Sequence, residues 1–287
     1  MNIRLAFSPD SDDLFMFYAL VAGKIDTGGL TFTAERADTE SLNARADAGD
    51  VDVLAVSIAR YATIHERYQL LPHGASVGRG YGPVVVTVPG GATSLDDLRE
   101  KRVGIPGART TAALVLRILM GARPYEPVVL PISPYARTFE ALRGGEVAAA
   151  LLIHEGRLTY EREGFARVLD IGEAWASQTG GLPLPLGGNV IRRDLGAPLI
   201  AKVSDLCRKS IEWAIAHHDE VAQALLAADE RADVGLDAGL LNRYLAMYAN
   251  EDTRDMREDV VRAMAELFRR GADAGVFLGN VPLDLAP

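Results

Sequence analysis

The sequence predicts an α/β protein with two lobes, and three observations support this prediction. Strand-like runs alternate with helix-like runs over most of the chain, which is typical of the α/β class. The length of 287 residues suits two domains better than one core. A middle block carries Gly and Pro at both edges. We therefore predict a first lobe at 1–87 and 184–287, a second lobe inserted at 88–183, and a central ligand-binding cleft between them.

The first lobe opens with strands and helices in alternation. Residues 3–8 alternate as a strand does. The acidic residues Asp10, Asp12 and Asp13 precede an apolar periodic run, which predicts a helix start, and Gly23 predicts its end. The next strand, helix and strand are predicted at residues 30–36, 38–50 and 51–59.

The alternation continues from residue 80 into the second lobe, and a helical tail follows. The predicted elements are, in order, a strand at 80–90, a short helix capped by Ser94, a strand, glycine turn and helix at 102–122, a helix at 134–146 and a strand at 147–155. Residues 167–195 predict one strand and an irregular segment rich in Gly and Pro, and the chain from about 198 predicts helices. We expect mainly parallel strand pairing.

The composition argues against several classes of function. A net charge of −9 and a pI near 5.1 disfavour a nucleic-acid partner or an anionic membrane surface, which need basic patches. No apolar run approaches the roughly 20 residues that span a bilayer, and no export signal is present, so we expect a cytoplasmic protein without a membrane partner. The single cysteine, Cys207, has no disulfide partner and lies in a helical, core-like context.

One histidine stands out from the other four. The apolar run 148–153 predicts a buried strand, and His154 and Glu155 follow it directly. Histidine titrates near neutral pH, so this position could deliver a group that moves a proton. The segment lacks the second histidine of a helical zinc site, so we expect no metal. Position alone leaves open whether His154 is functional or a core histidine, and whether Glu155 orients the imidazole or faces solvent.

Hydroxyl side chains end one strand and begin one helix at the expected cleft. Gly107 allows a tight turn before Thr110 and Thr111, and a helix that starts with free N–H groups and hydroxyls can hold a carboxylate. Thr110 as a simple helix cap is the alternative. Ser57 ends a buried strand and either faces the cleft or satisfies the local backbone.

Two loops remain ambiguous from their residues alone. The segment GASVGRGYGP, which contains Arg79, fits a hinge, a ligand-facing loop or a turn. The segment SPDSDD is explained by a helix start rather than by a metal site, although Ser8 and Asp10 could still line the cleft.

Five segments together resemble the 1,4-dihydroxy-6-naphthoate synthase family of the futalosine pathway to menaquinone. They are FSPDSDDLFMFYAL, GRGYGPVVV, GARTTA, LLIHEGRLTY and TGGLPLPLG, and the resemblance covers about residues 3–195. It implies a two-lobed type 2 periplasmic-binding-protein-like fold with a central cleft. It also implies a carbon–carbon lyase that converts cyclic dehypoxanthinylfutalosine to 1,4-dihydroxy-6-naphthoate, acts on a small carboxylate without a cofactor or metal, and closes its lobes on the substrate.

The resemblance also implies roles for individual residues. His154 corresponds to the family's general base. The residues that correspond to the substrate contacts are Ala55, Val56, Ser57, Thr110 and Thr111. The chain departs from the family pattern at Asp10 and Asp12, which replace Cys and Asn, and by an added glycine in TGGLPLPLG.

Three other functions compete with this one. A chorismate dehydratase of the same pathway would share the fold, but that branch lacks the histidine and the LPLPLG segment. A small-carboxylate-binding protein would use the same cleft without chemistry, and the missing export signal counts against it. A ligand-sensing regulator would need a DNA-binding domain for which 287 residues leave no room. The oligomeric state stays open.

Overall fold

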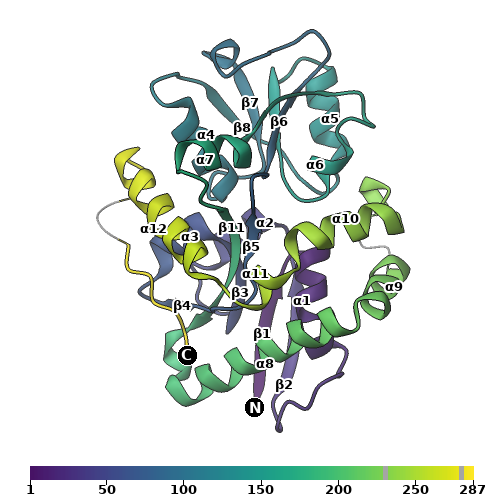
Figure 1. Ribbon diagram of the computed structural model, residues 1–287, viewed down its shortest axis with the longest axis vertical. Coiled ribbons are helices and arrows are strands. Elements are labelled where there is room, and N and C mark those ends of the chain that lie inside the picture. The colour runs from purple at the N-terminus through teal and green to yellow at the C-terminus, as the bar shows by residue number, and fades with distance from the viewer. Residues whose placement is uncertain (229–231, 278–280) are drawn as a thin grey trace.

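Two β-sheets, each with its own helices, form two lobes stacked along the long axis of the molecule (Figure 1). This computed structural model describes residues 1–228, 232–277 and 281–287. Both chain ends lie in the lobe that contains the first sheet (Figure 1).

The first sheet has the strand order β2-β1-β3-β11-β4, and β5 pairs with β11 beside β4. Its strands are β1 (Asn2–Phe7), β2 (Thr31–Arg36), β3 (Val53–Ser57), β4 (Tyr68–Leu70), β5 (Ser76–Gly78) and β11 (Leu184–Arg192). The second sheet has the order β10-β6-β9-β7-β8. Its strands are β6 (Val84–Thr87), β7 (Arg102–Ile105), β8 (Glu126–Val129), β9 (Ala149–Leu152) and β10 (Ala166–Asp170).

Both sheets are mixed, so the expectation of mainly parallel pairing is wrong. Among the described strands, four pairings are parallel and five are antiparallel. Every antiparallel pairing involves β6 or β11. These two strands directly follow the points where the chain passes from one sheet to the other, and they run against their neighbours.

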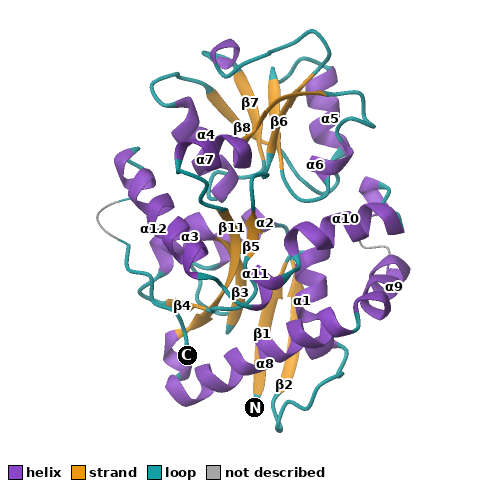
Figure 2. Ribbon diagram, in the orientation of Figure 1, coloured by secondary structure: helices purple, strands orange, loops and turns teal. Residues whose placement is uncertain are grey.

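Helices cover the sheets of both lobes (Figure 2). The first lobe carries α1 (Ser11–Val21), α2 (Thr39–Arg45), α3 (Ile58–Ile64), α8 (Ala197–Ala216), α9 (His218–Ala228), α10 (Ala238–Tyr248), α11 (Glu251–Arg254) and α12 (Glu258–Asp273). The second carries α4 (Thr111–Met120), α5 (Ala136–Arg143), α6 (Gly156–Thr159) and α7 (Ile171–Gln178). Short 3₁₀ turns lie at Asp96–Leu98, Arg193–Leu195 and Ala232–Val234. None of the helices in the described ranges has the length and apolar character needed to cross a bilayer.

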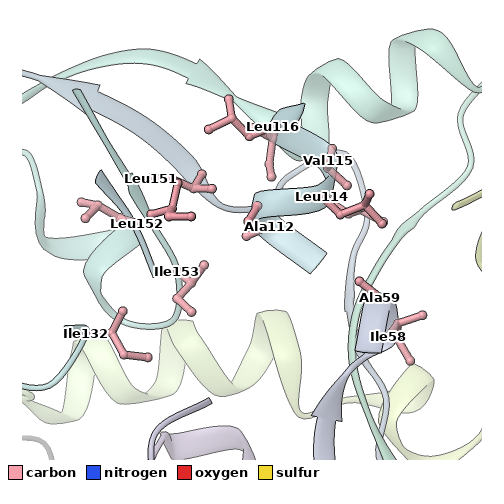
Figure 3. Close-up of a cluster of buried hydrophobic side chains, with 14 of the residues drawn as sticks. Ile58, Ala59, Ala112, Leu114, Val115, Leu116, Ile132, Leu151, Leu152 and Ile153 are labelled. Carbon is pink, nitrogen blue, oxygen red and sulfur yellow. The ribbon is translucent and has the colours of Figure 1, made fainter. Parts of the chain in front are cut away.

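The apolar strand β9 forms part of the core that supports the cleft. All four of its residues are buried, and Ile153, which follows it, is 7% exposed. Figure 3 shows Leu151, Leu152 and Ile153 in the same apolar cluster as Ala112 and Val115 of α4. This packing holds the end of β9 and the start of α4 in fixed positions relative to each other.

A second apolar cluster joins α1 to the C-terminal helices. It contains Phe15 and Phe17 of α1 together with Leu206, Cys207 and Ile211 of α8. The core position expected for Cys207 is confirmed, and burial raises the pKa of its thiol to about 12. The helical tail therefore anchors α1, whose first residues reach the cleft.

Sequence reasoning missed several elements, among them α3, β4, β5 and β8 as well as α7 and β11, and it misplaced one strand relative to the sheets. The segment 167–195 contains α7 and the nine-residue strand β11 rather than one strand and an irregular segment. Residues 84–87 were assigned to the first lobe, but β6 pairs with β9 and β10, so this strand belongs to the second sheet. The division into domains itself remains a prediction.

Candidate active site

A cavity lies between the two lobes and holds about 720 Å³ of empty space, including its open side. Its walls come from both lobes: from the first, β3, β5, β11 and α10, and from the second, the start of α4 and the end of β9. All six predicted site residues line this one cavity. They are Ala55, Val56, Ser57, Thr110, Thr111 and His154. Their roles in binding and catalysis remain predictions.

His154 lies at the junction of the lobes with one ring edge buried. Its Nδ1 lies 3.0 Å from Oδ2 of Asp10, which is 1% exposed and belongs to the first lobe. The histidine side chain is 19% exposed. The residue lines the cavity, so the part of the side chain that stays exposed lies on the cavity side.

The backbone around His154 holds the ring in this position. His154 has a φ of +47°, a left-handed conformation that costs a residue other than Gly about 1–2 kcal/mol. The Tyr135 hydroxyl donates to the Ile153 carbonyl at 2.5 Å, and the Arg157 N–H donates to the His154 carbonyl at 3.2 Å. Gly156 is required beside this turn, because a Cβ there would lie 2.5 Å from the Tyr135 ring. The surrounding contacts thus impose the strained turn that aims the imidazole.

The charges around His154 favour its protonated form. Burial opposes the imidazolium, but the Asp10 carboxylate, and beyond it those of Asp12 and Glu155, outweigh burial and raise the pKa of His154 to about 9. The imidazole is therefore a stronger base than a free histidine, and at neutral pH most of it carries a proton.

Carboxyl groups gather at the same end of the cavity. Asp12 accepts hydrogen bonds from the hydroxyls of Ser76 and Tyr244. Burial raises the pKa of Asp12, although the charge of His154 partly opposes this. Burial, with the nearby Asp12, raises the pKa of Asp13 to about 8. This end of the cavity can therefore store protons near neutral pH.

Glu155 does not face solvent, so that alternative is wrong. The residue is 0% exposed, and its Oε1 accepts hydrogen bonds from the Ser11 N–H at 3.1 Å and the Ser11 hydroxyl at 2.7 Å. Ser11 begins α1 in the first lobe, so Glu155 ties the two lobes together beside the histidine.

The start of α4 presents hydroxyls to the cavity. Thr110 is the helix cap: its hydroxyl accepts a hydrogen bond from the Ala113 N–H at 3.2 Å and donates one to the Gly107 carbonyl at 2.8 Å. The Thr111 hydroxyl accepts from the Ala59 N–H at 3.0 Å and donates to the Leu186 carbonyl at 2.7 Å. Thr110 is thus both a cap and a cavity residue, while the Thr111 hydroxyl joins the second lobe to the first.

Ser57 keeps a donor for a ligand. Its backbone N–H donates to Asn43 Oδ1 at 2.9 Å, and Asn43 Nδ2 donates to the Ser57 hydroxyl oxygen at 3.0 Å. A hydroxyl that accepts one hydrogen bond still has its own O–H to donate. Ser57 therefore serves the local backbone and the cavity at once.

The glycine-rich loop reaches the cavity through Gly74, Ser76 and Pro83, but its arginine does not. Arg79 forms ion pairs with Asp252 at 2.6 Å and with Asp259 at 2.7 Å, and it is absent from the cavity wall. Part of the loop thus faces the cavity, as the ligand-facing alternative expects, while Arg79 ties the loop to the C-terminal helices.

Sequence reasoning missed several cavity residues that come from distant segments. They are Ser76, Leu186, Gly187, Gly188, Tyr244 and Tyr248. The LPLPLG segment carried a signal for Leu186 and Gly187 on β11, but nothing in the helical tail marked the two tyrosines. Among the described residues that line the cavity, none is Lys or Arg. Within the same described ranges, no group of three or more His, Cys, Asp or Glu is arranged to hold a metal ion.

A family model described as menaquinone biosynthesis matches residues 3–273. The chain belongs to this menaquinone-biosynthesis family. It is 38% identical over 275 residues to the 1,4-dihydroxy-6-naphthoate synthase of Thermus thermophilus, covering 96% of this chain and 95% of that protein. It is 34% identical over 276 residues to the enzyme of the same name from Streptomyces coelicolor, covering 96% and 94%. The resemblance inferred from the five sequence segments is confirmed, and the curated names support the expectation of a lyase.

Solved structures confirm the fold of this family member. A crystal structure from Archaeoglobus fulgidus superposes with a TM-score of 0.86 at 39% identity, covering 96% of this chain and 98% of that chain. The alkanesulfonate-binding protein of Xanthomonas axonopodis pv. citri gives a TM-score of 0.72 at 12% identity, covering 98% and 95%. At that identity the likeness shows the fold alone, and it agrees with the predicted two-lobed, periplasmic-binding-protein-like architecture.

Proposed function

We propose that this chain converts cyclic dehypoxanthinylfutalosine to 1,4-dihydroxy-6-naphthoate in menaquinone biosynthesis, with His154 as the general base. The observation that carries the proposal is the position of His154. Its Nδ1 lies 3.0 Å from a buried carboxylate, and the residue lines the cavity between the lobes. The relatives that bear the name of this synthase support the choice of reaction.

The base step uses the neutral imidazole. With its proton on Nδ1 beside Asp10, His154 keeps a lone pair on Nε2 for the substrate. Nε2 takes a proton from carbon, the electron pair left behind expels the ribose-derived fragment, and formation of the aromatic naphthoate ring drives the step. The proton on Nε2 then leaves to solvent or to the released fragment, which restores the base.

Electrostatics supports one orientation of the substrate. The start of α4 has backbone N–H groups and no acidic side chain in its first turn. At the other end of the cavity, Asp12 and Asp13 would repel an anion whenever they are ionised. We therefore propose that the substrate carboxylate binds at the start of α4, through backbone N–H groups at Thr110 and Thr111 and the hydroxyl of Ser57, and that the reacting end of the substrate lies at His154. Neutral donors, rather than Lys or Arg, would hold this carboxylate.

The rest of the cavity wall suits a flat ring. Leu42, Val56, Ile153 and Leu186 supply apolar surface along the wall. Apolar walls exclude water and strengthen the electrostatic contacts of the reacting groups. Closure of the lobes over the substrate and a cytoplasmic location remain predictions.

Turnover of cyclic dehypoxanthinylfutalosine by the purified protein tests the proposal. We expect the absorbance of naphthoate to rise with the wild-type protein and with the surface variant His218→Ala. The folded His154→Ala variant should lose about 100-fold to 10,000-fold in kcat, which is typical for a missing general base. Full activity of His154→Ala would refute the base. Consumption of chorismate instead would assign the dehydratase reaction, and binding without turnover would assign a carboxylate-binding protein.

A further inference from the structure

Two consecutive residues of one lobe meet two consecutive residues of the other. His154 and Glu155 follow β9 in the second lobe, and Asp10 and Ser11 precede and begin α1 in the first. Nδ1 of His154 lies 3.0 Å from Asp10, and Glu155 accepts two hydrogen bonds from Ser11. The pairs are separated by 144 positions along the chain in both cases, so only the tertiary fold brings them together.

We propose that Asp10 is the positioning residue of His154: its carboxylate reaches across the boundary between the lobes and holds the imidazole in the tautomer whose Nε2 faces the cavity. The inference rests on the proposed function, because it assigns a partner to the general base of that site. It implies that the base is assembled only where the two lobes meet.

The side chain of Asp10 behaves unusually for its place in the helix. Asp10 is the N-cap of α1, and Asp at this position normally accepts a hydrogen bond from the N–H of the second or third helical residue. Here the side chain makes no capping hydrogen bond. Its carboxylate turns instead toward His154, while the backbone stays in place through the Leu14 N–H, which donates to the Asp10 carbonyl at 3.1 Å.

The neighbouring carboxylates are engaged with other groups. Glu155 accepts from Ser11, Asp13 accepts from the Ser8 N–H at 2.8 Å, and Asp12 accepts from Ser76 and Tyr244. Among the described residues, the ion pair of His154 is with Asp10, whose Oδ2 lies 3.0 Å from Nδ1 of the imidazole. The groups that face His154 electrostatically are thus Asp10 first, then Asp12 and Glu155, with Tyr244 behind Asp12.

Titration of the His154 imidazole in the free protein tests the pairing without any substrate. Protein with isotope-labelled histidine would be followed by NMR from pH 5 to about 10.5, and the signal of His154 identified by its loss in His154→Ala. We expect Asp10→Asn to lower the pKa of His154, about 9 in the wild type, by about 1 to 3. The neutral imidazole of the wild type should carry its proton on Nδ1.

Asp219→Asn is the matched control, because Asp219 lies 3.4 Å from His218 on an exposed surface. It should leave the titration of His154 unchanged. Asp10→Glu keeps the charge and should retain most of the raised pKa, which also covers the case in which Asp10→Asn does not fold. An unchanged titration of His154 in Asp10→Asn, or loss of the raised pKa in Asp10→Glu, would overturn the proposal.

Turnover separates this proposal from the proposed function. In Asp10→Asn the rising limb of kcat/KM against pH should move to lower pH along with the histidine, and its plateau should fall while KM changes little. A wild-type protein that forms no naphthoate would refute the proposed function, and the NMR titration would still decide the role of Asp10. A purely structural role for Asp10 would lower activity at every pH without moving the limb.

Discussion

Two helices, α1 and α4, begin at the same cavity, and their first turns are built in opposite ways. The cap of α4 is Thr110, a neutral hydroxyl that binds the helix backbone and leaves the first turn without acidic groups. The cap of α1 is Asp10, which makes no capping bond and is followed by Asp12 and Asp13. The start of α4 can therefore bind an anion, whereas the start of α1 already carries acidic side chains of the protein itself.

This difference suggests separate roles for the two helix starts at the site. The backbone N–H of Ser11 at the start of α1 is satisfied by Glu155 from the other lobe. The first N–H groups of an α-helix have no partner within the helix, and in α4 the first two residues, Thr111 and Ala112, line the cavity. In the proposed mechanism, the α1 end therefore holds the reacting group, His154, and the α4 end binds the substrate carboxylate.

The largest loss of stability is expected from Glu155→Ala, which removes the contact of the second lobe with the start of α1. The change leaves two buried donors of Ser11 without their acceptor, which should lower the free energy of unfolding by roughly 3 kcal/mol. Chemical denaturation followed by circular dichroism measures this loss. Glu155→Gln keeps an acceptor oxygen and should lose clearly less. Equal stability of Glu155→Ala and the wild type would show that the contact between the lobes contributes nothing.

The corresponding change at the start of α4 is Thr111→Val, which keeps the shape of the side chain and removes its hydroxyl. The Ala59 N–H then loses its acceptor, so we expect a loss of about 2 kcal/mol in the free energy of unfolding. Thr159→Val serves as a control within the second lobe, since its hydroxyl makes only a long bond of 3.4 Å to Gly156. A larger loss in the control than in Thr111→Val would contradict this account.

A smaller effect is expected from Thr110→Ala, which tests whether α4 depends on its cap. Loss of the hydrogen bond from the Ala113 N–H should lower the free energy of unfolding by about 1 kcal/mol. The substrate KM should rise with little change in kcat, because the change affects the binding end and not the base. A fall in kcat at constant KM would move Thr110 to the reacting end.

The smallest effect is expected from Arg109→Ala at the rim of the α4 start. Arg109 pairs with Glu40 across the lobes at 3.0 Å, but its side chain is 46% exposed. Exposed ion pairs contribute between about 0 and 1 kcal/mol and weaken as salt rises. The difference in unfolding free energy between Arg109→Ala and the wild type should therefore vanish at high salt.

Gly107 offers a contrasting test. A Cβ there would lie 2.2 Å from the Glu40 side chain, so Gly107→Ala should disturb the loop at any salt concentration.

The starts of both helices could be predicted from the sequence, and so could most strands of alternating or apolar pattern. Caps, glycines and periodicity are local signals, and they placed α1, α4 and β9 correctly. The strand β11 was missed because its Pro and Gly residues are typical of loops. In the structure its pairing with three strands overrides that local preference.

The site residues also divide into those with a local signal in the sequence and those that only the tertiary structure brings together. His154 stood out because an imidazole ends an apolar strand, and Thr110 because it caps a helix after a glycine turn. The partnership of Asp10 with His154 carries no local signal, since it depends on how two lobes meet. The same holds for Tyr244, which reaches Asp12 from a helix 232 positions away.

The pH dependence of kcat/KM for naphthoate formation tests the central claim most directly. Because the neutral imidazole is the active form and its pKa is raised to about 9, the rate should rise about tenfold per pH unit from neutrality and level off near pH 9. In His154→Ala the rate should be about 100-fold to 10,000-fold lower at the plateau, and this limb should disappear. A variant without His154 that keeps both the rate and the limb would contradict the assignment of His154 as the base.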